Sequence, residues 1–171
     1  EKILLAGLAG ALGILTKQAF AVPLLPLAIW MLVSRKVRFF IPVVASILCW
    51  AAFSWICLGS VTNTGYNATT PAHAAAFWSH SLWRGLHLQL SSCRTGLFVY
   101  SPILVLCLIP FALRLWQRKV TPLEWAAMAA IFLQASLYAI WFDPLGGEAL
   151  GPRYLVVVIP LFALLIVHVK P

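Results

Sequence analysis

Acidic residues are almost missing from this 171-residue chain, which has four Asp and Glu in all and only 9% charged residues. Soluble domains average about a quarter charged residues. Hydrophobic residues, in contrast, make up 63% of the sequence. A chain with so little charge cannot cover a water-exposed surface, so the composition excludes a soluble globular domain.

Cysteine is scarce as well, and its positions exclude a disulfide framework. Three of the four cysteines lie in apolar runs and only Cys93 lies in a polar stretch, so no loop pair is available. A histidine metal site is also excluded. His73, His80 and His87 are spaced seven residues apart, about 10.5 Å along a helix, which is too far for one zinc ion. The sequence predicts neither a metal nor a cofactor.

Long apolar runs take the place of a soluble amphipathic pattern. They predict an all-α, polytopic transmembrane helical bundle of about five to six membrane segments. Residues 3–33 would form a helix of about 46 Å, longer than the roughly 30 Å apolar core of a bilayer, so we expect a break at Lys17. The two halves are residues 3–15 and 20–33.

Further helices are expected after a basic hinge at residues 34–38. Thr121, Pro122 and Glu124 form the pattern of an N-cap, a first-turn proline and a capping box. In the polar stretch 59–96, Thr70-Pro71 predicts the start of a helix that lies in the outer membrane interface, with His80 and His87 on its polar side. The expected spans are 39–58, 97–113, 122–142 and about 152–168.

Basic residues set the expected topology. The hinge at 34–38 and the cluster at 114–119 hold three Lys or Arg each, and the positive-inside rule makes both cytoplasmic. The loops 59–96 and 143–153 are then outside. This distribution accounts for the net charge of +8 without a nucleic-acid partner. We treat residues 1–171 as one transmembrane domain, and expect a fragment of a longer protein because the first residue is Glu1.

Three cations do not follow the positive-inside pattern. Lys17, Arg94 and Arg153 lie on the expected outer side, each at the start of a helix that runs inward. A helix N-terminus already carries about half a positive charge, so a bound anion would stabilise a cation there. The sequence therefore predicts a phosphate-binding surface, with anchoring to lipid headgroups as the alternative. Asp143 and Glu148 could each be a general base or an ion-pair partner of Arg153.

Three glycines on the first expected helix predict a close contact with another helix. Gly7, Gly10 and Gly13 lie at a spacing that places them on one side of residues 3–15. Small residues at such a spacing allow two membrane helices to approach closely. We expect them to form a helix contact rather than a ligand site.

Two segments carry a resemblance to a known family. They are residues 94–102, Arg-Thr-Gly-Leu-Phe-Val-Tyr-Ser-Pro, and residues 146–155, Gly-Gly-Glu-Ala-Leu-Gly-Pro-Arg-Tyr-Leu, followed by Pro160. With the Gly-x-x-Gly-x-x-Thr-Lys pattern at 10–17, they resemble the membrane-embedded GT-C glycosyltransferases of the protein mannosyltransferase-like and aminoarabinose transferase-like types. The resemblance implies transfer of a sugar from a polyprenyl-phosphate carrier to an acceptor glycan, lipid or protein. It places the active site on the outer face of a bacterial inner (plasma) membrane.

The resemblance also implies roles for individual residues. The cations would hold the carrier phosphate, and two tyrosines would stack on or hydrogen-bond to the sugar or lipid head; Glu148 departs from the aromatic residue that is common in the family. The full set is Lys17, Arg94, Arg153, Tyr100, Tyr154 and Glu148. The family's catalytic acid lies in the first outer loop, for which this chain has no matching motif, so we expect it upstream. A transporter or flippase for a lipid-linked or anionic substrate, and a non-catalytic membrane scaffold, are the alternatives.

Overall fold

The computed structural model describes residues 1–16, 18–61, 78–141, 143–144, 151 and 153–166. Every regular element in these residues is helical, so the predicted all-α class is confirmed. The stretch expected to form one domain divides into two compact units, Glu1–Ala76 (unit 1) and Phe77–Pro171 (unit 2), and each is described by itself.

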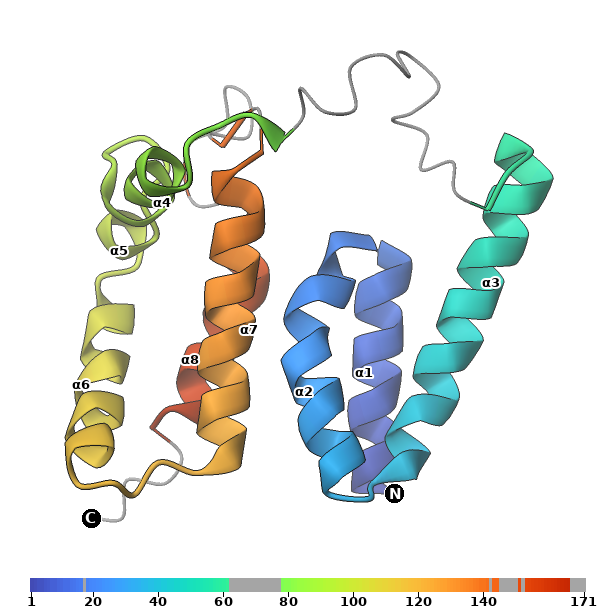
Figure 1. The fold of residues 1–171 in the computed structure, drawn as a ribbon, viewed down its shortest axis with the longest axis horizontal. Helices are drawn as coiled ribbons and strands as arrows, with labels where there is room; N and C mark the ends of the chain where they lie inside the picture. The colour runs from blue at the N-terminus through green and yellow to red at the C-terminus, as the bar shows by residue number, and fades with distance from the viewer. Residues whose placement is uncertain (17, 62–77, 142, 145–150, 152, 167–171) are drawn as a thin grey trace. The chain divides into compact units, whose positions relative to one another are not determined.

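Unit 1 begins with the broken helix that the sequence predicts (Figure 1). The first helix ends at Thr16 and a 3-10 turn begins at Gln18, so the predicted division into two halves is confirmed. The predicted span at 39–58 is present as well. The elements are α1 (Lys2–Thr16), η1 (Gln18–Phe20), α2 (Ala21–Val33), η2 (Val37–Phe39) and α3 (Phe40–Leu58).

The glycines of α1 allow the helices of unit 1 to approach closely. A Cβ added at Gly7 would collide with the backbone carbonyl oxygen of Phe39, and one at Gly10 would lie 3.1 Å from a methyl of Leu24. A Cβ added at Gly13 would collide with the ring of Phe20. The predicted helix contact is therefore confirmed.

Unit 2 is built around α7, whose N-terminus is capped as the sequence predicts. The hydroxyl of Thr121 accepts from the Glu124 N–H, and the Glu124 carboxylate accepts from the Thr121 N–H at 2.7 Å. Because the helix ends at Ala139, the expected end at 142 is too late. The elements are α4 (Leu82–Ser91), α5 (Leu97–Tyr100), α6 (Ile103–Trp116), α7 (Pro122–Ala139), η4 (Val156–Val158) and α8 (Ile159–Leu164).

The predicted span at 97–113 is wrong as a single helix. It is interrupted at Ser101-Pro102, which separates the four-residue α5 from α6. Proline has no N–H and clashes with the carbonyl four residues before it, which explains the interruption. Within the described part of the last predicted span, η4 and α8 are also short.

A helix, α4, lies in the stretch 59–96, starting at Leu82 after an extended Ser81. The predicted helix start at Thr70-Pro71 lies outside the described residues. The start of α4 is tied to the end of α7, since the His80 N–H donates to the Ile140 carbonyl at 3.2 Å. Gly85 then lies so close to the Ala139 carbonyl that a Cβ would collide with it. These contacts fix α4 across the end of α7.

A buried ion pair joins α6 to α7. The Glu124 side chain is 1% exposed and its Oε1 lies 2.6 Å from an Arg114 nitrogen. A second nitrogen of Arg114 donates to the Lys119 carbonyl at 3.0 Å. The carboxylate that caps α7 therefore also fixes the connection between the two helices.

The two basic hinges adopt the same turn. Arg35 and Arg118 both have φ of 55°, in the left-handed region that usually favours glycine. In each hinge the N–H of the following lysine donates to the carbonyl five residues before it, at 2.9 Å for Lys36 and 2.8 Å for Lys119. This bond is typical of the Schellman motif that ends a helix.

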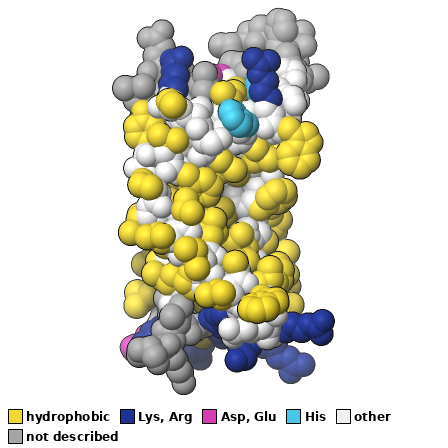
Figure 2. Space-filling view, turned by 90° about the vertical axis from the view of Figure 1, so that its left-hand side faces the viewer, with side chains coloured by type: hydrophobic (Ala, Val, Ile, Leu, Met, Phe, Trp, Pro, Cys, Tyr) yellow, Lys and Arg dark blue, Asp and Glu magenta, His cyan; other side chains and the backbone are white. Residues whose placement is uncertain are grey.

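Apolar side chains cover the outside of the helices. On the face of unit 2 in Figure 2, Lys and Arg gather at the two ends and hydrophobic side chains cover the band between them. Among the described residues, one helix, Val37–Leu58, is long and apolar enough to cross a membrane, and only 17% of its apolar window is buried. Three others, Lys2–Thr16, Ala21–Val33 and Ile103–Trp116, are apolar but shorter.

Candidate functional site

Two of the predicted phosphate-binding cations lie on loops that are bonded to each other in unit 2. The Gly151 N–H donates to the Arg94 carbonyl at 2.9 Å, and the Arg153 N–H donates to the Gly151 carbonyl at 2.8 Å. Gly151 has φ of 93°, a conformation that residues with a Cβ rarely adopt, so glycine permits this contact. The Arg94 and Arg153 side chains are both exposed.

Tyr100 lies beside the same loop contact. Its hydroxyl donates to the Cys93 carbonyl at 3.3 Å, and its ring bounds the space next to Gly151. The side chain is 44% exposed. The hydroxyl oxygen keeps lone pairs that could accept a hydrogen bond from a ligand.

Tyr154 is held firmly by α7. Its ring stacks on that of Tyr138, with centroids 4.1 Å apart and an interplanar angle of 7°. Its carbonyl accepts from the side-chain amide of Gln134 at 3.3 Å. Because Tyr138 covers one face of the Tyr154 ring, only the other face could contact a sugar.

The helix-dipole reasoning has little support at Arg94, which precedes the four-residue α5. Arg153 precedes η4, whose three residues lead directly into the six-residue α8. The macrodipole needs several aligned peptide units, so α5 supplies little positive potential. The case for an anion at these residues therefore depends on their own charges and on the contact between their loops.

The remaining predicted site residues are not placed. Lys17 and Glu148 lie outside the described residues, and Lys17 belongs to unit 1. Asp143 is described and half-buried, near the end of α7. The structure thus brings together four of the six predicted residues: Arg94, Tyr100, Arg153 and Tyr154.

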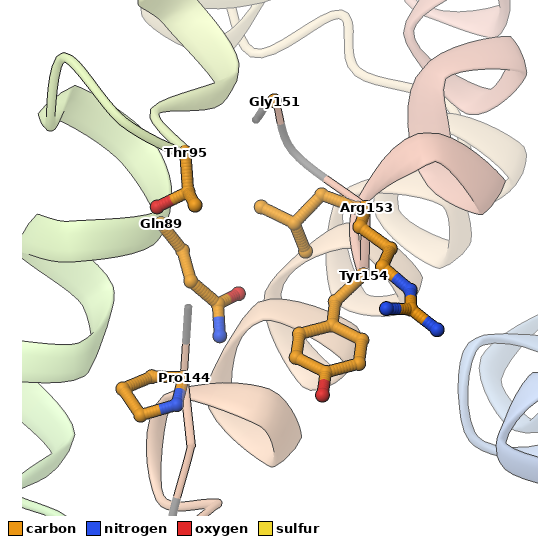
Figure 3. Close-up of a pocket in the computed structure, with 7 residues that line it drawn as sticks. Gln89, Thr95, Pro144, Gly151, Arg153 and Tyr154 are labelled. Atoms are coloured by element: carbon orange, nitrogen blue, oxygen red, sulfur yellow. The ribbon is translucent and has the colours of Figure 1, made fainter. Parts of the chain in front are cut away.

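A small pocket opens next to these residues (Figure 3). It contains about 170 Å³ of space, with open solvent at its mouth included. The Gln89 amide points into the space between Pro144 and Tyr154, whereas the Arg153 guanidinium points away from Gln89, on the other side of Tyr154. The lining residues are Gln89, Thr95, Pro144, Gly151, Arg153, Tyr154 and Leu155.

Thr95 and Gln89 form the α4 side of the pocket. Thr95 is 3% exposed, and its hydroxyl donates to the Leu88 carbonyl at 3.0 Å, which fixes the loop that carries Arg94. Gln89 is 2% exposed, and neither atom of its amide has a hydrogen-bond partner in the structure.

The sequence reasoning missed Gln89, although a signal was present. Gln89 follows Gly85 by four residues, so both occupy one face of α4. That face packs on α7 through Gly85. A glutamine on the packing face of an amphipathic helix is unusual, because buried polar groups normally have partners.

Comparisons with models of protein families, with curated proteins and with solved structures found no match for this chain.

Proposed function

We propose that this chain is part of a GT-C-type glycosyltransferase, which moves a sugar from a polyprenyl-phosphate carrier to an acceptor at the outer face of the bacterial inner membrane. The observation that carries the proposal is the hydrogen bond from Gly151 to the Arg94 carbonyl, which brings the loops of Arg94 and Arg153 together beside a pocket. The catalytic acid belongs to the part of the protein that we expect upstream.

Two guanidinium groups on adjacent loops suit a lipid phosphate. Each guanidinium presents a planar set of N–H donors that matches phosphate oxygens, and such charge-assisted bonds are the strong ones. As the glycosidic bond breaks, negative charge grows on the phosphate leaving group, and fixed cations stabilise that charge. Arg94 and Arg153 are exposed and accessible to such a group.

The surface of unit 2 supports a multi-pass arrangement. Large apolar side chains point outward along its helices, as they do where a protein surface meets a bilayer. We propose that α5 and α6 together form one kinked span, about 30 Å long, and that the chain has about five to six membrane segments. Exposed examples in unit 2 are Val99, Ile103, Leu106, Ile109, Trp116 and Phe132.

Cysteine labelling tests this orientation. Cys93 is exposed next to Arg94, and we expect it to react with a membrane-impermeant maleimide in intact cells. In a Cys93→Ser background, an Arg118→Cys variant should react only after the cells are permeabilised, since Arg118 is in the cytoplasmic cluster. Labelling of both positions from the same side would overturn the topology.

Substitution of Arg153 tests the activity. Arg153→Ala in the full-length protein, purified and reconstituted in liposomes, should lower sugar transfer from the polyprenyl-phosphate donor about 10- to 100-fold. A hydrogen bond to a charged group contributes roughly 1.5–3 kcal/mol, and each 1.4 kcal/mol is tenfold. Arg84→Ala is the matched control, because Arg84 is an exposed arginine on α4 that does not line the pocket. Unchanged turnover in Arg153→Ala would remove Arg153 from the site.

Broken helices favour one other function. The interruptions after Thr16 and at Ser101-Pro102 are of the kind found where transporters bind substrates. A flippase would move a fluorescent polyprenyl phosphate across liposomes without forming a glycosylated product. Lipid movement in the absence of sugar transfer would therefore decide for the flippase.

A further inference from the structure

Gln89 is a buried polar group whose presence the packing of unit 2 does not explain. An amide removed from water without a hydrogen bond is destabilising, and a leucine at this position would be compatible with the apolar contacts of α4. Gln134 provides a comparison within the same unit: it is equally buried and its oxygen also has no partner, but its nitrogen donates to the Tyr154 carbonyl. Gln134 thus has a structural role, whereas the Gln89 amide points into the pocket.

The chemistry of the amide selects the ligand. The nitrogen of a carboxamide only donates hydrogen bonds and its oxygen only accepts them. A phosphate only accepts and would leave the Gln89 oxygen without a partner, while an ammonium group only donates and would leave the nitrogen without one. Hydroxyl groups donate and accept, so a pair of neighbouring hydroxyls satisfies both atoms.

The walls of the pocket agree with this choice. Opposite the amide lie the apolar ring of Pro144 and the ring of Tyr154, which could contact the C–H groups of a sugar. The pocket is small and open to solvent on one side, so it takes at most the hydroxyl-bearing edge of a sugar ring and not a whole lipid-linked donor.

We propose that the Gln89 pocket binds the hydroxyl-bearing edge of the sugar on the lipid carrier, through hydrogen bonds from and to the Gln89 amide. This inference rests on the proposed function and deepens it. The phosphate is held by Arg94 and Arg153, of which the Arg153 guanidinium lies on the other side of Tyr154 from Gln89. Gln89 then distinguishes a carrier with a sugar from one without.

The test compares two lipids on the full-length protein in nanodiscs. The probes are polyprenyl phosphate and the same lipid carrying one hexose. Wild-type protein should bind the hexose lipid about tenfold more tightly, the equivalent of roughly 1.4 kcal/mol. Gln89→Leu should abolish this preference and leave binding of the bare lipid unchanged. The thermal unfolding temperature should stay the same or rise, because an unpartnered buried amide is removed.

Controls separate a local effect from a loss of folding. Gln117→Leu makes the same substitution at an exposed position at the end of α6, and it should keep the preference for the hexose lipid. Gln89→Met is the second pocket variant, used if Gln89→Leu does not fold. It keeps an unbranched side chain of similar length without the amide.

The outcomes distinguish the two proposals. If wild-type protein binds both lipids equally, or if Gln89→Leu keeps the preference, the amide has only water as its partner and this inference is overturned. The phosphate site would survive either result. If Gln89→Leu weakens both lipids equally, the inference also fails. If wild-type protein binds the hexose lipid but not the bare lipid, and the Gln89→Leu variant no longer binds the hexose lipid, the phosphate proposal fails and the sugar pocket is supported. If neither lipid binds, both fail.

Discussion

The two units share one turn and differ in their interiors. Each has a helix hairpin closed by Arg-Lys-Val, with the arginine in the left-handed conformation at Arg35 and at Arg118. Inside unit 1, the buried polar side chains of the described residues are hydroxyls of α3, Ser46 and Ser54. Inside unit 2 they are Gln89, Thr95, Glu124 and Gln134.

The difference lies in the size of the buried polar groups. The Ser46 hydroxyl donates to the Val43 carbonyl on its own helix, and the small Ser54 hydroxyl has no hydrogen-bond partner in the structure. In unit 2 the buried groups need partners on other segments, as Glu124 does with Arg114. Such groups serve the geometry of a connection or a ligand. Among those of unit 2, Gln89 is the one of which neither amide atom has a hydrogen-bond partner in the structure.

Glu124→Ala should have the largest effect on stability. It leaves Arg114 partly buried without its anion and removes the carboxylate half of the capping box, while the Thr121 cap on the backbone N–H of residue 124 remains. Breaking a buried pair in this way costs about 3–5 kcal/mol. The measurement is the free energy of unfolding in detergent, by denaturant titration. The double variant Arg114→Met with Glu124→Leu should recover most of the loss, since it removes both charges. A loss below about 1 kcal/mol would mean that the ion pair does not hold unit 2 together.

Glycine-to-alanine substitutions at two close contacts compare the helix packing of unit 1 with that of unit 2. Gly85→Ala forces its Cβ against the Ala139 backbone and should cost about 1–3 kcal/mol or more, with α4 displaced from α7. Gly10→Ala meets only the methyls of Leu24, which can shift, and should cost less than about 1 kcal/mol. Thermal unfolding of both variants checks the order. Equal costs would show that α4 is not fixed by the contact at Gly85.

Glycine at the two hinges should have the smallest effect. Arg35→Gly and Arg118→Gly each relieve a left-handed residue, and each should raise the free energy of unfolding by about 0.5–1 kcal/mol. Because the two turns have the same geometry, the gains should be equal within error. Each substitution also removes one positive charge. Maleimide labelling of Cys93 in intact cells should be the same in both variants, which would show that the topology is unchanged. A gain in the free energy of unfolding at only one hinge would show that the two turns are not equivalent.

Features that depend on neighbouring residues were predictable from the sequence. The cap formed by Thr121 and Glu124 and the break around Lys17 follow from local side-chain chemistry. The spacing of Gly7 and Gly10 predicted a close helix contact, but not its partners Phe39 and Leu24. The interruption at Ser101-Pro102 was open to prediction by the same reasoning, yet the apolar run that follows it favoured one long span.

Long-range contacts set the limit of prediction for the candidate site. The sequence singles out Arg94 and Arg153 by their charge, but the four-residue α5 after Arg94 gives the helix-dipole argument little support there. The contact between their loops depends on Gly151, far along the chain from Arg94. Gln89 could not be assigned to a pocket without Pro144 and Tyr154, which come from other segments.

The sequence by itself determined the all-helical class and several of the points at which helices begin and end, because composition, caps and prolines act within a few residues. Only the tertiary structure decided which polar groups meet. Burial removes water from Gln89 and Glu124, and whether a partner replaces that water depends on residues far away in the chain. For Glu124 the fold supplies Arg114, and for Gln89 it supplies an open pocket.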